Sequence, residues 1–261
     1  MNRFEGRRAL ITGGGSGIGQ ATVLRMLAEG GRVVAADLSA EGLADTVQRA
    51  GENADRLGTV VLNVAEEDSV RAGVAEAISW LGGLDVLVNA AGILRSSHTH
   101  ETSLVDFETV LRVNLGGTFL VTRESIPALR DGTGSAVVNF SSTSAGFAHP
   151  YMAAYAASKG GIQSMTHALA AEYAADGIRF NSVQPGSISS GMTDGSGKSR
   201  QSVGPGLPED ANLALFAKLS PAIGNGYAGP ETVAGVVAML ASDDGAFVTG
   251  TEVRIDGGTH F

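Results

Sequence analysis

Short apolar runs alternate with longer helical patterns along all 261 residues, and this alternation constrains the fold more than any other feature. Each strand-like run is followed by a stretch whose apolar or alanine-rich spacing is typical of a helix. Such chains form right-handed strand–helix–strand units, which place parallel strands side by side with helices on both faces. The sequence therefore predicts an α/β fold, a doubly wound parallel sheet, in a single domain over residues 1–261.

The expected elements follow from the same patterns. Strands are expected at Arg8–Thr12, Arg32–Leu38, Thr59–Asn63, Leu84–Ala90, Ala136–Ser142, Arg179–Gln184 and Glu252–Asp256. Helices are expected at Ile18–Glu29, Glu41–Ala50, Glu66–Trp80, Ser103–Leu129, Tyr155–Ala175 and Glu231–Ser242. The glycine-rich segment Ser189–Pro208 fits neither pattern, and we expect it to be a mobile flap over the substrate.

Composition excludes several kinds of partner and site. The 27 acidic and 18 basic residues give a net charge of −9, which repels nucleic acid. The chain has no cysteine, so disulfides and thiolate metal sites are excluded. His98 and His100 lie in a polar loop without further ligands, so we expect no metal site there. No apolar run reaches the roughly 18 residues of a membrane span, and a cytoplasmic protein is expected.

A glycine-rich turn, Thr12–Gly19, connects the first expected strand to the first helix. Glycine permits a tight turn there and lets backbone N–H groups at a helix N-terminus approach a pyrophosphate closely. The second strand ends in Asp37 about 20 residues further on, where a ribose-binding acid belongs. The sequence thus predicts the dinucleotide site of a Rossmann fold, formed by Gly13, Gly15, Ser16, Gly17, Ile18, Gly19, Asp37 and Leu38.

The same acid predicts which dinucleotide binds. The carboxylate of Asp37 can accept hydrogen bonds from both adenosine ribose hydroxyls and would repel a 2′-phosphate. No arginine or lysine lies in the glycine turn or directly after Asp37 to bind that phosphate. NAD is therefore the expected cofactor.

Tyr155 and Lys159 lie four residues apart at the start of an alanine-rich helix, so they share one helix face. A phenol with a pKa of about 10 is protonated at neutral pH. A neighbouring ammonium stabilises the phenolate, so we expect Lys159 to lower the pKa of Tyr155. Tyr155 could then accept and return a proton as a general acid and base.

With these motifs the sequence resembles the short-chain dehydrogenase/reductase family, in its ordinary form of about 250 residues. The resemblance covers practically the whole chain. The motifs that carry it, in the family's order and spacing, are Thr12–Gly19, Asn89-Ala90-Ala91-Gly92, Asn114, Ser142, Tyr155–Lys159 and Pro185-Gly186.

The resemblance implies an oxidoreductase that transfers a hydride between NAD and a secondary alcohol or ketone. It implies that Ser142 binds the substrate oxygen, that Lys159 binds the nicotinamide ribose, and that Asn114 holds a water in a proton relay. Family members commonly form tetramers through the helix of Tyr155 and its neighbour, so a homotetramer is expected. Further cofactor contacts are expected from Asn63, Val64, Asn89, Ala90, Ala91, Gly92, Tyr155, Lys159, Pro185, Gly186, Ile188 and Ser190.

Two positions depart from the family pattern. Asn63 stands before Val64 where the family usually has aspartate, but its amide oxygen can still accept a bond from the adenine amino group. Ser190 stands where the family often has threonine; serine keeps the hydroxyl but lacks the methyl that fixes the rotamer. The loop Asn89–Gly92 could equally serve packing of the sheet or contact with the adenosine ribose.

Two alternatives to this function stay open. One is a 3-oxoacyl-carrier reductase of lipid synthesis, usually NADPH-linked, against which Asp37 argues. The other is a non-catalytic NAD-binding sensor, which would not need the set Asn114, Ser142, Tyr155 and Lys159. The substrate pocket is expected at Arg95–His98, Ser144–Tyr151, Ser187–Met192 and Leu213–Phe216. Ser141 and Ser144, the neighbours of Ser142, are expected to cap a turn with their hydroxyls. These segments do not specify one alcohol.

Overall fold

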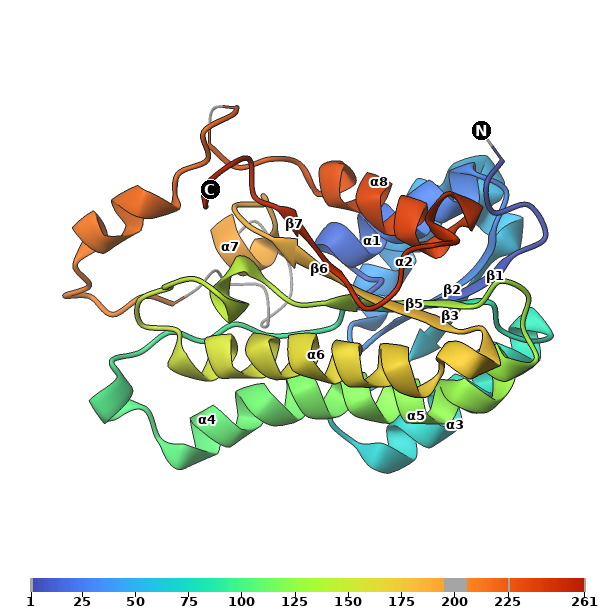
Figure 1. Ribbon diagram of the computed structural model, residues 1–261, viewed down its shortest axis with the longest axis horizontal. Coiled ribbons are helices and arrows are strands. Elements are labelled where there is room, and N and C mark those ends of the chain that lie inside the picture. The colour runs from blue at the N-terminus through green and yellow to red at the C-terminus, as the bar shows by residue number, and fades with distance from the viewer. Residues whose placement is uncertain (1, 195–205, 225, 261) are drawn as a thin grey trace.

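A computed structural model describes residues 2–194, 206–224 and 226–260. Seven parallel strands form one sheet in the order β3-β2-β1-β4-β5-β6-β7 (Figure 1). This is the predicted doubly wound α/β fold. The strands are β1 (Arg8–Thr12), β2 (Arg32–Asp37), β3 (Leu57–Val61), β4 (Val86–Asn89), β5 (Ala136–Phe140), β6 (Arg179–Pro185) and β7 (Glu252–Ile255).

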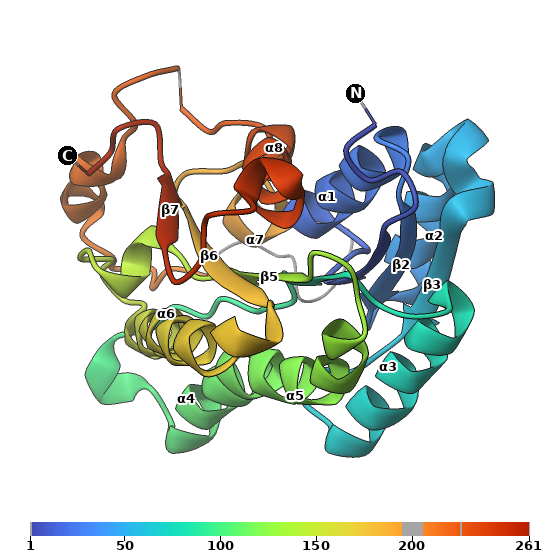
Figure 2. The same ribbon diagram turned by 45° about the vertical axis from the view of Figure 1, so that its right-hand side comes forward.

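Helices cover both faces of this sheet, as Figures 1 and 2 show. The alternation of side chains along each strand separates the two cores. On β1, Ala9 and Ile11 pack into one core with Val23 of α1 and Val237 of α8, whereas Leu10 packs into the other. Successive strand residues are thus all buried, which is why the strands appear as continuous apolar runs in the sequence.

The helix boundaries lie within a few residues of those expected. The longer helices are α1 (Gly17–Ala28), α2 (Ala40–Ala50), α3 (Glu67–Leu81), α4 (Leu104–Leu111), α5 (Gly117–Arg130), α6 (Ala153–Glu172) and α8 (Pro230–Ala241). A four-residue turn, α7 (Gly191–Asp194), follows β6. No helix in the described ranges is both long and apolar enough to cross a membrane.

The expected continuous helix Ser103–Leu129 is wrong in one respect. A π-helical turn at Arg112–Gly116 separates α4 from α5. Such turns insert one residue per turn and frequently occur at functional sites. Here the turn contains Asn114, whose side chain is fully buried and bonded to the backbone of Ile93.

Most of the expected flap Ser189–Pro208 lies outside the described residues, which omit 195–205. Its first residues continue from β6 through Ile188, which forms a bridge with Ala228. Its mobility, and the division of the chain into one domain with a flap, stay predictions.

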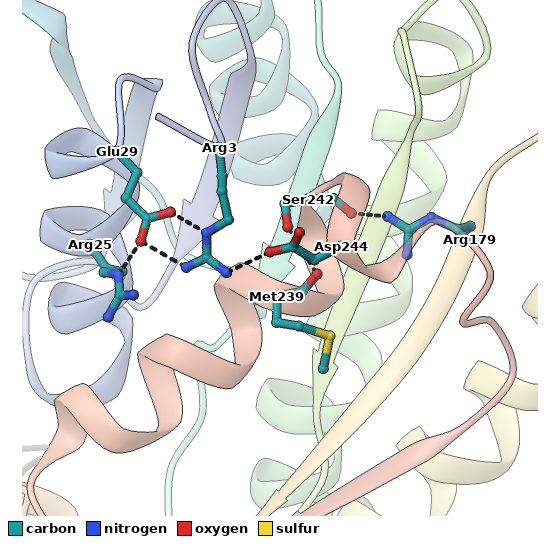
Figure 3. A network of polar contacts seen from close by, with 7 residues as sticks. All are labelled: Arg3, Arg25, Glu29, Arg179, Met239, Ser242 and Asp244. Carbon is teal, nitrogen blue, oxygen red and sulfur yellow. Dashed lines mark hydrogen bonds and ion pairs between the residues drawn. The ribbon is translucent and has the colours of Figure 1, made fainter. Parts of the chain in front are cut away.

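An ionic network connects the N-terminal segment to α1 and to the turn after α8 (Figure 3). Arg3 donates to both carboxylate oxygens of Glu29, at 2.6 and 2.7 Å, and to Asp244 at 3.2 Å. Glu29, only 5% exposed, also accepts from Arg25. The bond from Arg3 holds the pKa of Glu29 below its usual range. Segments far apart in sequence are thereby held together at one end of the helical layer.

Candidate active site

A cavity of about 970 Å³ opens at the carboxyl ends of the strands. Parallel sheets of this type bind ligands at that edge. Its lining includes eighteen of the predicted residues besides Ser142: Gly13, Ser16, Gly17, Ile18, Gly19, Asp37, Leu38, Asn63, Val64, Ala90, Ala91, Gly92, Tyr155, Lys159, Pro185, Gly186, Ile188 and Ser190. The lining as described does not include Gly15, Asn89 or Asn114. Most of the expected cofactor and chemistry residues thus share one cavity.

The glycines of the first turn are required by close backbone packing. A Cβ at Gly19 would lie 2.1 Å from the carbonyl oxygen of Gly13. Gly13 has a φ of +71°, and a Cβ there would lie 2.8 Å from the backbone of Ala90. The turn therefore brings the N-terminus of α1 against the loop after β4, with its amide groups at the cavity.

Asp37, the last residue of β2, is fixed beside this turn. One carboxylate oxygen accepts the N–H of Gly15 at 3.0 Å and the other accepts the N–H of Ser39 at 2.9 Å. Gly15 and Asp37 also line a smaller adjoining cavity of about 560 Å³. Two arginines line that cavity as well, Arg25 and Arg49, but each is in an ion pair with an acid, Glu29 and Asp45 respectively.

Asn63 and Ser190, which depart from the family pattern, both have side chains within hydrogen-bonding distance of other groups of the protein. The Asn63 side-chain oxygen accepts the N–H of Ala65 at 3.1 Å, which leaves its second lone pair for a ligand. The Ser190 hydroxyl lies 3.3 Å from that of Thr193. Thr193 also donates to the carbonyl of Ile188 at 2.6 Å, so its hydroxyl positions that of Ser190.

Ser142 lies beyond the end of β5, because this strand ends at Phe140 rather than at the expected Ser142. It is the N-cap of a short 3₁₀ turn, and its hydroxyl oxygen accepts the N–H of Ser144 at 3.2 Å. The expectation that Ser141 and Ser144 cap this turn is therefore wrong. Ser141 donates instead to the carbonyl of Lys159 at 3.0 Å and joins the loop to α6.

Tyr155 and Lys159 lie on the inner face of α6, 9% and 5% exposed. Burial raises the pKa of Tyr155 to about 12, and a hydrogen bond with Ser142 opposes this rise. Burial also lowers the pKa of Lys159 to about 8. The Lys159 ammonium donates to the carbonyl of Phe140 at 2.7 Å and lies 5.5 Å from the centre of the Tyr155 ring. The pKa of Tyr155 is therefore raised rather than lowered in this structure, because desolvation of the phenolate outweighs the hydrogen bond from Ser142.

Asn114 lies behind Lys159. Its amide nitrogen donates to the carbonyl of Ile93 and to the Ser158 hydroxyl, both at 3.0 Å, and its oxygen accepts the N–H of Ile93 at 2.8 Å. A Cβ on Gly92 would lie 3.1 Å from that oxygen and 3.6 Å from Lys159 Nζ. Gly92 therefore leaves room for Asn114 and Lys159 to approach the cavity side by side.

Asn89, the last residue of β4, is bonded within the core. Its amide nitrogen donates to the hydroxyl of Thr122 at 3.0 Å and to the side-chain oxygen of Asn139 at 2.9 Å. Asn139 in turn donates to Thr166 of α6 at 3.0 Å. Of the two roles considered for this loop, the geometry favours packing for Asn89, while Ala90, Ala91 and Gly92 line the cavity.

The end of the cavity where the substrate alcohol is expected, here called the alcohol end, is lined only partly by the expected segments. Arg95, His149, Met192 and Phe216 line it as expected, whereas Tyr151 does not. The residues contributed by the C-terminal turn and the segment before α8 were not expected from the sequence. These are Leu219, Ser220, Pro221, Tyr227, Thr259 and His260. Leu207, from the expected flap, and Met152, from the loop before α6, also line the cavity. No local motif marks them, but the neighbouring positions of β6 and β7 in the sheet bring their following loops together.

Comparison with known proteins places this geometry in a family. Residues 13–260 match the family model described as "Enoyl-(Acyl carrier protein) reductase". The chain is 38% identical to the 3-oxoacyl-[acyl-carrier-protein] reductase of Thermotoga maritima, over 98% of both chains. It is 35% identical to the cyclohexanol dehydrogenase of an Acinetobacter strain, over 98% of this chain and 96% of that one.

Solved structures give the same result. A short chain dehydrogenase from Mycobacterium paratuberculosis bound to NAD matches with a TM-score of 0.89 and 31% identity, over 98% of both chains. One from Burkholderia cenocepacia in complex with NADP matches with a TM-score of 0.85 and 31% identity, over 99% of both. The chain belongs to the short-chain dehydrogenase/reductase family and is an oxidoreductase that acts on alcohols or ketones with a nicotinamide cofactor.

Proposed function

We propose that this enzyme transfers a hydride between NAD and a secondary alcohol or ketone, with Tyr155 as the general acid and base. The observation that carries the proposal is one cavity lined at one end by the glycine turn and Asp37, and at the other by Ser142, Tyr155 and Lys159. When bound, the nicotinamide ring supplies or accepts the hydride.

The protein's own groups provide the proton and the positioning. In reduction, the phenol of Tyr155 donates its proton to the substrate oxygen while the Ser142 hydroxyl donates a hydrogen bond to the same atom. In oxidation, the proton returns to Tyr155. The ammonium of Lys159 lies near enough to stabilise the phenolate formed in reduction, and it can donate to the hydroxyls of the nicotinamide ribose. Asn114 orders the backbone behind Lys159 and is proposed to hold a relay water there.

The preference for NAD rests on Asp37. Its fixed carboxylate would repel a 2′-phosphate, and the arginines of the adjoining cavity are already paired with Glu29 and Asp45. We expect NAD to bind at least tenfold more tightly than NADP, about 1.4 kcal/mol. Calorimetric titration of both cofactors tests this; Asp37→Ser should narrow the gap, and equal affinities in the wild type would overturn the preference.

The acid/base assignment is tested by Tyr155→Phe, which removes the proton while keeping the ring. Turnover should fall by about 10²–10⁴-fold, and NAD affinity should stay close to that of the wild type. Lys159→Ala should weaken NAD binding as well. A Tyr155→Phe enzyme that keeps more than about a tenth of wild-type turnover would show that another group moves the proton.

A second candidate is reduction of a 3-oxoacyl group on a carrier protein, the activity for which the Thermotoga maritima relative is named. The proton transfer would be the same in both functions, so they differ only in the cofactor used and in whether the substrate is an acyl carrier thioester. Comparison of NADH and NADPH oxidation with a 3-oxoacyl thioester distinguishes the two functions. Absence of turnover with any alcohol, ketone or thioester would leave the cofactor-binding sensor.

The assembly is proposed to be a homotetramer. Large apolar side chains are exposed on α4 and α5, among them Leu104, Val105 and Phe119. They lie on the helical layer that includes α6, the helix expected to form the interface. Sedimentation analysis tests the tetramer. A cytoplasmic location stays a prediction from the sequence.

A further inference from the structure

Two imidazoles lie on the alcohol end of the cavity, and the proposed reaction uses neither. His149 comes from the loop between Ser142 and α6, and His260 comes from the turn after β7. Their ring centres are 6.1 Å apart. Loops following β5 and β7 thus bring two histidines together in the cavity that Ser142 and Tyr155 also line.

A compact turn fixes the position of His260. The Asp256 carboxylate accepts the N–H of Gly258 at 3.0 Å and that of His260 at 3.1 Å, and Thr259 donates to the Asp256 carbonyl at 2.6 Å. Gly257 and Gly258 adopt φ values of +64° and +74°, which favour glycine. The His260 ring then stacks on Phe147, with centres 4.1 Å apart and planes 1° from parallel.

His260 has an unmet polar atom. Its Nε2 is buried and has no hydrogen-bond partner within the described part of the chain. A buried polar atom without a partner is costly and is usually explained by a ligand or an ordered water.

His149 is held from the other side. Its Nε2 lies 3.1 Å from the hydroxyl of Thr143, the residue after Ser142. Burial, and to a smaller extent His260, lowers the pKa of His149 to about 4, so the ring is uncharged at neutral pH. A neutral imidazole has one donor and one acceptor nitrogen. Because Thr143 engages Nε2, it is Nδ1 that remains to bond a hydroxyl or a carbonyl of a substrate.

Apolar side chains also line the cavity that contains the two rings. Leu94, Met152, Leu207 and Phe216 pack in one cluster with Tyr155 and also line the cavity. Arg95, a cation of the lining, is in an ion pair with Asp106 at 2.5 Å, so its charge is already compensated. A substrate in this cavity meets these apolar side chains together with polar ones, among them the two imidazoles, Ser187, Ser220 and Arg112.

We propose that His149 and His260 form a subsite for a second, uncharged oxygen of the substrate. The preferred substrates are then diols, hydroxyketones or diones rather than alcohols with a single oxygen. This inference rests on the proposed function, since the first oxygen is the one bound by Ser142 and Tyr155. It narrows that function to a substrate class.

The test compares matched substrates with NAD as the cofactor. Values of kcat/KM are measured for cyclohexanol against the isomeric cyclohexanediols, and for 2-butanol against 2,3-butanediol, with a correction for two equivalent hydroxyls. The wild type should prefer at least one diol by on the order of tenfold or more, the gain of one or two added hydrogen bonds. A ratio near one for every pair would overturn the inference.

The two histidines are tested separately. His260→Phe keeps the stack on Phe147 but removes the ring nitrogens, and His149→Phe removes the bond to Thr143. In each variant the ratio of diol to mono-alcohol should fall toward one, whatever the absolute rates. His149→Gln, which keeps a polar group, should restore part of the ratio. His100→Phe, a substitution at an exposed histidine outside the lining, is the matched control and should leave the ratio unchanged.

A direct measurement covers the case in which a variant does not fold. In wild-type protein with ¹⁵N-labelled histidine and NADH, the imidazole signals of His149 and His260 should shift on addition of the diol but not of the mono-alcohol. Signals that respond equally to both compounds would contradict the subsite. Loss of mono-alcohol turnover in Tyr155→Phe reports on the proposed function alone. Absence of turnover for every pair in the wild type would overturn the subsite, whereas the proposed function is overturned only when no alcohol, ketone or thioester is turned over.

Discussion

At the scale of single residues, the opposed effects on Tyr155 give a pH prediction. Burial raises its pKa and the Ser142 bond lowers it, so Ser142→Ala should raise the pKa further. The ionised fraction at a given pH then falls, and the profile of kcat/KM for alcohol oxidation should move to higher pH. Ser144→Ala removes a buried hydroxyl with no partner in the described ranges and should leave the profile in place. A profile that Ser142→Ala does not move would contradict the bond's role.

Gly92 gives a second prediction at this scale. A methyl group there would lie 3.1 Å from the Asn114 oxygen, which must then shift slightly, and at an ordinary contact distance of 3.6 Å from Lys159 Nζ. Gly92→Ala should lower turnover by about ten- to a hundredfold, the cost of a misplaced catalytic group. Gly146→Ala is the control, because a Cβ there meets nothing within 4 Å. Equal activity of the two variants would show that Asn114 and Lys159 tolerate displacement.

At the scale of elements, two contacts hold the segment 210–216, which lies at the alcohol end of the cavity. Asn212 donates its N–H to the Tyr151 hydroxyl at 2.9 Å, and His98 lies 2.9 Å from the Asp210 carboxylate. Tyr151 has a φ of +65°, rare for a bulky residue, and such strain often marks functional sites. Phe216, on the same segment, stacks against Tyr151 and lines the cavity.

These contacts predict an effect on substrate binding. Tyr151→Phe should raise KM by about two- to tenfold, the loss of one hydrogen bond, with little change in kcat. Asp210 raises the pKa of His98, so the ion pair is present below that pKa and weakens as pH rises through it. KM should therefore increase with pH in the wild type, and Asp210→Asn should flatten that increase. Glu209→Gln, at the exposed neighbour of Asp210, is the control; a KM independent of pH in the wild type would rule out the ion pair as a fastening.

The elements also show how far the sequence could predict this molecule. β1 was predicted to the residue, because a buried strand bounded by a glycine turn has a local pattern. The π-turn around Asn114 was missed, since it is stabilised by the distant backbone of Ile93 rather than by its own spacing. The Tyr155–Lys159 pair was found from spacing, but the direction of the Tyr155 pKa depends on burial, which spacing does not reveal. His260 was missed because only the order of β6 and β7 brings it to the cavity.

At the scale of the whole molecule, the network of Arg3, Glu29 and Asp244 predicts a stability effect (Figure 3). Glu29→Gln should lower the free energy of unfolding by about 1–3 kcal/mol, because buried charged hydrogen bonds are lost. Because the folded-state pKa of Glu29 is lowered, its contribution is present above its unfolded pKa and is lost as pH falls through the folded value. Denaturant unfolding at neutral and acidic pH measures this. Asp244→Asn, at a side chain 56% exposed, should cost little, and an equal loss in both variants would contradict the assignment.

The two ends of the cavity are formed by different loops, and this has a practical consequence for engineering. Its cofactor end comes mainly from loops after the first four strands, and its alcohol end mainly from segments after β5, β6 and β7. Libraries that vary Asp37 and its neighbours and libraries that vary His149, Phe216 and His260 therefore change different parts of the chain. The effects of substitutions at sites without shared partners are nearly additive. Variants with altered coenzyme preference and variants with altered substrate range should therefore be selectable separately, and their substitutions can then be combined in one gene.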